Sequence, residues 1–370
     1  MASLSPYLRL YAKRLKRLPL TIALRNLISW QPSDTWVEGY TVVIACMNDL
    51  DAVAVANLRS CALLHHDRLH QIILVFDCLR DDISENVRSA AHEISREIPV
   101  ELIGYSERQF RVAKGINWGW VYSWLSWCLG IAHSRTRAVI LHDLDAMPLA
   151  PSLFENLYDN WLEMKADFCG IRRYKGNGVP EELGLVATFE MVLDAGFVRR
   201  NCRPFDLFNK LELASGRVVD FDTTLYVQLP PATRAVRSID ETDLLHPSRL
   251  ICQYTDLVSG RSDFTGQDHG LFMLIYFLFL GGHSEPLHSA ALRLTEEGCR
   301  KIPLFGKEFS IDGITPMSWA WTEKQIRRAE QFYFGKTRPE VERYLTGIIT
   351  RAGAHRTVGV ETGPFAVAAY

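Results

Sequence analysis

The chain has 370 residues, of which 48% are hydrophobic and 23% are charged. Its 41 Lys and Arg residues against 43 Asp and Glu residues give a formal net charge of −2, which argues against a generally basic nucleic-acid-binding protein. A chain of this length can bury a sizeable core, as one large domain with appended segments or as two domains.

The first 37 residues are basic and separate from the rest. Six cationic residues precede the first acidic residue, Asp34: Arg9, Lys13, Arg14, Lys16, Arg17 and Arg25. Leu8, Tyr11, Leu15 and Leu18 occur at helical spacing among them, and Pro19 is expected to limit this helix to few turns. Two interpretations stay open: residues 1–30 contact an anionic membrane surface, or the helix caps the domain from outside.

From about residue 38 the pattern alternates between apolar strands and amphipathic helices, which predicts an α/β fold with a mostly parallel sheet flanked by helices. We expect strands at residues 42–46, 72–76, 100–104, 139–141 and 167–172, and helices at 83–94 and 118–132. From the basic loop at 172–178 through Pro247 the sequence looks irregular. Residues 271–280 predict an apolar helix, and 319–349 predict helices broken near Gly335 and Pro339. The expected division is a basic segment at 1–37, a main domain at 38–290, and a helical extension and tail at 291–370.

Cysteine usage and hydropathy indicate a cytoplasmic protein. The eight cysteines are scattered, without a CxxC pair, and several lie in apolar runs, as expected of reduced thiols. No stretch reaches the ~20 apolar residues of a membrane-spanning helix, so the apolar run at 270–280 is expected to be a core helix.

The most informative motif is His142-Asp143-Leu144-Asp145, directly after an apolar strand. Side chains on a strand alternate between its faces, so Asp143 and Asp145 can approach one divalent cation from the same side, whereas His142 points to the other face. The alternative is an Asp pair that caps the following turn. In parallel sheets, ligands bind beyond the carboxyl ends of the strands, and Asn48 and Asp77 also follow predicted strands.

These elements together resemble nucleotide-sugar glycosyltransferases of the GT-A fold over residues 40–290. The resemblance is carried by the strand at 42–46, the strand ending in Asp77, Lys114-Gly115, the DxD motif, Gln267-Asp268 and a late histidine. It implies an enzyme of the hexosyltransferase type that moves a sugar from a nucleotide-diphosphate donor to a glycan or lipid-linked acceptor, in surface polysaccharide or glycolipid synthesis.

The resemblance also implies a divalent cation, Mn²⁺ or Mg²⁺, between the DxD motif and the donor diphosphate. Asp145 is expected to be the direct ligand, and Asp143 to contact the cation, its water or the ribose. His288 is our choice for a third ligand, with His283 second.

For the donor, the resemblance implies that Asp77 contacts the nucleoside, that Asn48 borders the same base pocket, and that Lys114 lies near phosphate. Each of these residues also has an ordinary explanation as a turn former or a solvated side chain.

Asp268 corresponds to the acidic residue that faces the acceptor, where it would act as general base in an inverting enzyme. Gln267-Asp268 also resembles the element that positions the donor sugar in retaining, glycogenin-type enzymes, so the stereochemistry stays open. Asp268 as a plain helix cap is the alternative.

Two further segments have competing interpretations. The basic loop at 172–178 suits a lid over a diphosphate or a solvated turn. Four tryptophans at helical spacing favour core packing over sugar stacking: Trp118, Trp120, Trp124 and Trp127.

Three other functions compete with glycosyl transfer. A haloacid-dehalogenase-type phosphatase also uses DxD, but there the motif opens the domain and continues into Gly-Thr, whereas Ala146-Met147-Pro148 follows here. A nucleotidyltransferase would carry a Gly-rich basic loop after the first strand, which residues 45–51 lack. A non-catalytic scaffold or carbohydrate-binding protein of the same fold is compatible with the sequence.

Overall fold

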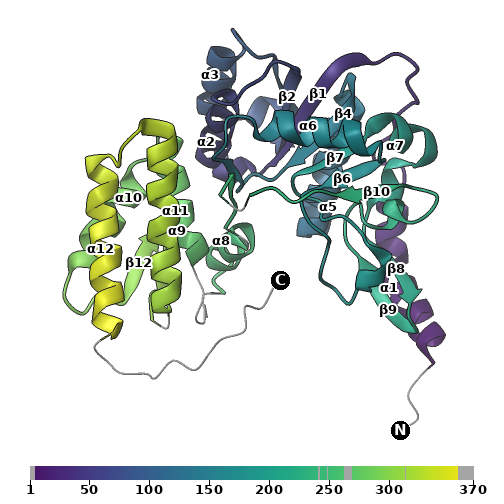
Figure 1. Ribbon diagram of the computed structural model, residues 1–370. Helices are drawn as coiled ribbons and strands as arrows, with labels where there is room; N and C mark the ends of the chain where they lie inside the picture. Colours follow the sequence, from purple (N-terminus) through teal and green to yellow (C-terminus); the bar gives the residue numbers. More distant parts are fainter. Residues whose placement is uncertain (1–4, 241, 248, 262–268, 313, 357–370) are drawn as a thin grey trace.

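The computed structural model describes residues 5–240, 242–247, 249–261, 269–312 and 314–356. A seven-stranded sheet carries helices on both faces, and a group of C-terminal helices packs beside it (Figure 1). The predicted α/β class is therefore confirmed, including the helical extension at the C-terminus.

The strands of the main sheet lie in the order β10-β6-β7-β4-β1-β2-β3. β1 pairs in parallel with β2 on one side and with β4 on the other, so that Val42 faces Ile72 and Ile140. Among the described strands of this sheet, β7 alone is antiparallel to its neighbours. The bounds are β1 Val37–Cys46, β2 Leu69–Leu79, β3 Val100–Tyr105, β4 Thr136–His142, β6 Phe168–Gly170, β7 Met191–Asp194 and β10 Arg234–Val236.

Three short antiparallel pairs complete the strands: β5 Met147–Pro148 with β11 Leu244–Leu245, β8 Lys210–Ala214 with β9 Arg217–Phe221, and β12 Lys301–Leu304 with β13 Lys307–Ser310. Single 3-10 turns lie at Asn48–Leu50, Arg80–Asp82, Glu181–Leu183, Pro204–Leu207 and Tyr226–Gln228.

The alternation of side chains along β1 separates two cores. Val42 and Ile44 face one core, formed with α2 Asp51–Ala62, α3 Glu85–Ile94 and α6 Leu153–Met164. Val43 faces the other core, formed with α4 Glu107–Ile116, α5 Gly119–His133 and α7 Ala195–Asn201. α5 approaches β1 closely at Gly130, where a Cβ atom would lie 2.1 Å from Val43 Cγ1.

The C-terminal half packs around one buried helix, α9 His269–Leu280. Its side chains from Leu271 to Leu278 are buried, which confirms the predicted core helix. Around it lie α8 Leu250–Val258, α10 Glu285–Thr295, α11 Pro316–Phe334 and α12 Pro339–Arg356. The buried residues of these helices belong to the same core as α2 and one face of the sheet. Among the helices that the structure describes, no candidate for a membrane span is found.

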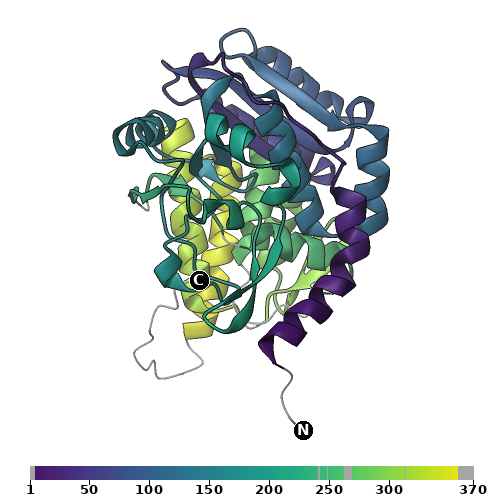
Figure 2. The same ribbon diagram turned by 90° about the vertical axis from the view of Figure 1, so that its right-hand side faces the viewer.

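Two expectations from the sequence were wrong. α1 spans Pro6–Leu24 and continues through Pro19, because Leu24 beyond the proline is buried and holds the last turn against the domain. Residues 172–247 are less irregular than expected, since β7, β8, β9 and β10 all lie in this region. α1 runs along one edge of the molecule, as Figure 2 shows in purple. All eight cysteines lie in the described part of the chain and are free thiols.

Candidate metal and donor site

The carboxyl ends of β4, β1 and β2 lie side by side at one edge of the sheet, because these strands are adjacent and parallel. The chain proceeds from β1 to β2 and β3 on one side and to β4 on the other. Such a reversal of strand order opens a crevice beyond the strand ends, where ligands bind in α/β folds.

A cluster of metal-ligating side chains occupies this edge. Asp143 and Asp145 follow β4, and His246 Nε2 lies 3.5 Å from Asp143 Oδ2 and 3.6 Å from Asp145 Oδ1. The three candidate ligand atoms all lie within 4.8 Å of one another. The side chain of Asp145 is only 8% exposed, whereas that of Asp143 is 32% exposed and lies nearer to solvent.

The short pairing of β5 with β11 brings His246 to the cluster. Met147 and Pro148, directly after the DxD motif, pair with Leu245 and Leu244. The backbone N–H of Leu149 also donates to the carbonyl of Asp243 at 2.7 Å. This pairing holds the segment after the DxD motif against the segment before His246, so that His246 lies beside the aspartates.

One side chain of α2 holds the turn that carries the aspartates. The amide nitrogen of Asn57 lies 3.0 Å from the carbonyl of Asp143 and 2.9 Å from those of Leu144 and Ala146. Asn57 is fully buried, and together with the backbone N–H of Ala146, which also donates to the Asp143 carbonyl at 3.1 Å, its amide satisfies carbonyl oxygens of this turn. Asn57 is thus a positioning residue of the DxD turn, and its sequence surroundings carry no signal of this role.

The electrostatics of the cluster suit a divalent cation. Burial raises the pKa of Asp143 to about 6, although the charge of His246 acts in the opposite direction and lowers it. Burial alone would lower the pKa of His246, but the two carboxylates together raise it above its ordinary value. Carboxylate oxygens with one imidazole nitrogen form a donor set that Mn²⁺ and Mg²⁺ accept, and a charge of +2 would offset the like charges of the aspartates. The residues present therefore fit the implied cation.

His142 faces away from this cluster, as the strand alternation predicts. It is fully buried, its Nδ1 lies 2.5 Å from Glu190 Oε1, and its ring packs edge-on against Phe154 of α6. Glu190 is also fully buried, so the pair fills the core behind the motif.

His288 and His283 do not enter this cluster. His288 is exposed on α10, with its ring 6.5 Å from that of Phe279, and His283 is exposed between α9 and α10. α10 packs on α9 and α12 in the C-terminal group, away from β4 (Figure 1). The histidine near the aspartates is therefore His246, and the choice of His288 from its late position in the chain is corrected.

Asn48 and Asp77 lie in contact beyond β1 and within the end of β2. The backbone N–H of Asn48 donates to Asp77 Oδ1 at 2.7 Å. Burial raises the pKa of Asp77 to about 6. Lys114 is exposed near the end of α4, with its Nζ 5.3 Å from the centre of the Phe110 ring. Gln267 and Asp268 lie outside the described residues.

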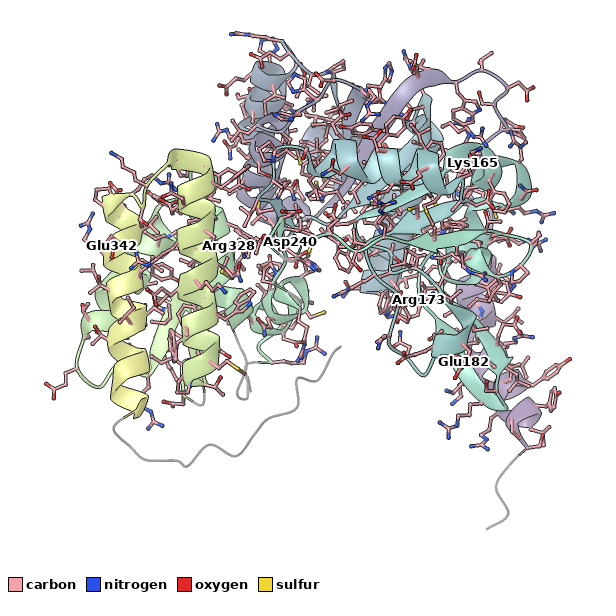
Figure 3. The ribbon with its side chains drawn as sticks, in the orientation of Figure 1. Lys165, Arg173, Glu182, Asp240, Arg328 and Glu342 are labelled. Carbon is pink, nitrogen blue, oxygen red and sulfur yellow. The ribbon has the colours of Figure 1, made fainter. Side chains whose placement is uncertain are left out.

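A cavity of about 310 Å³ opens beside Asp143. Its lining combines cations of the loop after β6 with two tryptophans of α5 and a second carboxylate: Arg172, Arg173, Lys175, Trp120, Trp127 and Asp222. Arg173, labelled in Figure 3, lies on this loop between the sheet and the β8–β9 hairpin. The loop and the tryptophans, which the sequence left with two interpretations each, thus meet at one cavity.

Several side chains of this cavity are oriented by packing. The Arg172 guanidinium lies 4.1 Å from the centre of the Phe189 ring, which in turn lies 4.6 Å from the His246 ring. Burial raises the pKa of Asp222 to about 6, and one of its oxygens accepts the backbone N–H of Thr223 at 2.7 Å. Asp222 had no signal in the sequence, since it follows a hairpin rather than a strand of the main sheet.

The tryptophans of α5 divide between core and cavity. Trp124 is fully buried and donates its Nε1–H to the Pro204 carbonyl, whereas Trp120 is 37% exposed at the cavity wall. Core packing therefore accounts for Trp124 but not for Trp120.

No protein-family model and no curated protein matches this chain. Among solved structures, it is similar to TarS 1-349 from S. aureus, with 12% identity, 86% of this chain and 91% of that chain covered, and a TM-score of 0.37. It is also similar to the mannosyltransferase PcManGT from Pyrobaculum calidifontis, solved in complex with GDP-Man and Mn²⁺, with 12% identity, coverage of 94% and 98%, and a TM-score of 0.38. A third such structure is glucosyl-3-phosphoglycerate synthase from Mycobacterium tuberculosis, with 12% identity, coverage of 65% and 80%, and a TM-score of 0.37.

At such identities and TM-scores these similarities carry no argument, and a function has to be argued from the residues of the site.

Proposed function

We propose that the protein is a metal-dependent glycosyltransferase, which moves a hexose from a nucleotide-diphosphate donor to a glycan or lipid-linked acceptor. The observation that carries this proposal is the cluster of Asp143, Asp145 and His246 at the carboxyl end of β4, next to the Asn48–Asp77 pair. We assign it to the cytoplasmic side of a membrane, in the synthesis of a surface polysaccharide or glycolipid.

In this proposal Asp143, Asp145 and His246 hold Mn²⁺ or Mg²⁺. When bound, the cation supplies charge stabilisation for the departing nucleoside diphosphate. Asp77 and the backbone of Asn48 bind the nucleoside, because a half-buried carboxylate at the strand end can accept hydrogen bonds from a base or ribose. Arg172 lines the same cavity as Asp143, whereas Lys114 is exposed on α4, so we assign Arg172 the main phosphate contact and Lys114 a peripheral one.

The proton of the acceptor hydroxyl needs a base if the enzyme inverts configuration. We keep Asp268 as the first candidate, with Gln267 beside it for the donor sugar. Within the described residues, Asp222 is a second candidate, because its carboxylate lines the cavity that also contains Asp143. The exposed face of Trp120 in the same cavity suits stacking on a sugar ring.

A donor-hydrolysis screen tests the proposal. The protein is incubated with a panel of nucleotide sugars and either Mn²⁺ or Mg²⁺, and release of nucleoside diphosphate is measured. We expect one donor to be hydrolysed slowly, with loss of activity on adding a chelator and in Asp145→Asn. Asp159→Asn, on the exposed side of α6, is the matched control and should retain activity.

The opposite result is also informative. If no donor is hydrolysed while Mn²⁺ and a nucleoside diphosphate still raise the melting temperature, the non-catalytic scaffold becomes the better interpretation.

A further inference from the structure

An apolar stripe is exposed along α1. Six large side chains of this helix reach the surface: Tyr7, Leu8, Tyr11, Leu15, Leu18 and Ile22. At 3.6 residues per turn, their positions fall within an arc of about 100°. Tyr7 and Ile22, near the two ends, are each 69% exposed. A continuous apolar surface of this kind marks an interaction site rather than the scatter of single apolar residues found on most proteins.

The stripe is not the surface by which α1 is attached to the domain. The opposite face carries the buried Leu10 and Leu24. Arg14 donates to the carbonyl of Leu211 at 3.0 and 3.2 Å, and Arg17 forms an ion pair with Asp220. These contacts fasten α1 to the β8–β9 hairpin and leave the apolar stripe facing outward.

Three cations lie on the side of α1 away from the stripe. Arg9, Lys13 and Lys16 are exposed and form no ion pair with any residue in the described part of the chain. No acidic residue precedes Asp34, so the whole helix is positively charged. An apolar face with basic residues on the polar face is the pattern of helices that lie in the interface of an anionic bilayer.

We propose that α1 binds the surface of an anionic membrane, with its apolar stripe inserted among the acyl chains and with Arg9, Lys13 and Lys16 on its polar face attracted by the anionic headgroups. No described helix is a candidate to cross the bilayer, so the contact is one of the interface. Lateral binding of this kind uses both the apolar area and the charge, and it weakens as salt screens the phosphates.

α1 is attached to the β8–β9 hairpin, and the chain continues from this hairpin to the cavity. Arg17 binds Asp220 at the end of β9, and Asp222, two residues later, lines the cavity beside Asp143. If the proposed function holds, on which this step rests, the acceptor is lipid-linked and reaches the cavity from the bilayer surface.

Vesicle flotation tests the membrane contact with the full chain. Vesicles of phosphatidylcholine alone are compared with an equal mixture of phosphatidylcholine and phosphatidylglycerol, without any nucleotide sugar. We expect the protein to float with the anionic vesicles. Lys13→Ala with Lys16→Ala should weaken binding about thirtyfold, and Leu15→Glu with Leu18→Glu about a hundredfold.

The matched control is Leu162→Glu with Leu292→Glu, which places two charges on exposed leucines of α6 and α10 and should float like the unchanged protein. Equal flotation of the Leu15/Leu18 variant, or absence of flotation of the unchanged protein, would overturn the proposal. So would a dimer in light scattering that the Leu15/Leu18 variant dissociates, because the stripe would then be an interface between two copies. Flotation is measured without donor and hydrolysis without vesicles, so failure of the membrane contact and failure of the proposed function are distinguishable.

Discussion

The histidine beside the aspartates is the residue on which the proposed metal site can be tested most directly. His246→Ala removes an imidazole that lies 3.5 and 3.6 Å from the two carboxylates. We expect its Kd for Mn²⁺ to rise about a hundredfold, as measured by isothermal titration calorimetry, since one of three candidate ligands is lost.

His288→Ala is the control for that measurement, because His288 is exposed on α10. Its affinity for Mn²⁺ should equal that of the unchanged protein. An effect of His288→Ala without an effect of His246→Ala would reinstate the histidine chosen from the sequence.

Asp77 predicts a pH dependence of stability. Burial raises its pKa from 3.8 to about 6 in the fold, so between these values the native state binds more protons than the unfolded state. The free energy of unfolding therefore falls as the pH rises through this window, and it stays lower above it. Asp77→Asn should remove this contribution, raising Tm at neutral pH relative to the unchanged protein and leaving Tm in strong acid similar.

Replacing Asp159 is expected to change Tm at neutral pH in the direction opposite to replacing Asp77. Its hydrogen bonds with Arg68 lower its pKa, so its stabilisation is present at neutral pH and is lost as the pH falls through the acid range. Asp159→Asn should thus lower Tm at neutral pH, by a small amount because Asp159 is exposed. A fall in neutral-pH Tm for Asp77→Asn would contradict the assignment for Asp77.

At the scale of elements, the side-chain amide of Asn57 connects α2 to the turn after β4. Asn57→Ala would remove one donor from the carbonyls of Asp143, Leu144 and Ala146, of which that of Asp143 keeps the backbone N–H of Ala146. We expect the free energy of unfolding in urea to fall by about 3 kcal/mol, together with weaker Mn²⁺ binding.

Asn156→Ala is the comparison, because the Asn156 amide donates to the hydroxyl of Ser152 on the exposed side of α6. It should change stability by less than about 0.5 kcal/mol. If Asn57→Ala destabilises the fold but leaves Mn²⁺ affinity unchanged, Asn57 supports packing alone and does not position the aspartates.

At the scale of the whole molecule, the C-terminal helices share a core with the sheet. The Tyr344 hydroxyl donates to the Phe272 carbonyl at 3.1 Å, and the Tyr276 hydroxyl donates to Glu330 at 3.0 Å. Phe272 also packs on Trp319 with ring centres 4.7 Å apart. We still propose residues 38–290 as the catalytic unit. This unit therefore depends on helices of the extension at 291–370 to cover side chains of α9.

A truncation tests this dependence. We expect a chain that ends at residue 290 to be insoluble or to lack a cooperative thermal transition, because α9 would expose several aromatic side chains. A chain that ends at residue 356 keeps every contact described here and should melt like the full protein. A soluble, cooperatively folded chain ending at 290 would show that the division at that residue separates two independent domains.

The main sheet, the core helix and the DxD motif could be predicted from the sequence because their signals are local. A strand such as β4 shows itself by consecutive apolar residues, and two aspartates at its end share a face by the alternation of the backbone alone. The same alternation placed His142 in the core, where it meets Glu190.

The composition of the site was decided by tertiary structure. His246 joins Asp143 and Asp145 through the two-residue pairing of β5 with β11, and Asp222 reaches the cavity through a hairpin fastened to α1. The β5–β11 pairing and the Arg17–Asp220 ion pair that fastens the hairpin join residues far apart in the chain, so no short window of sequence contains them. The sequence by itself determined the α/β fold and the carboxylates at the end of β4. Only the packing of the chain selected the histidine and the second carboxylate that face them, because those contacts depend on pairing between distant segments.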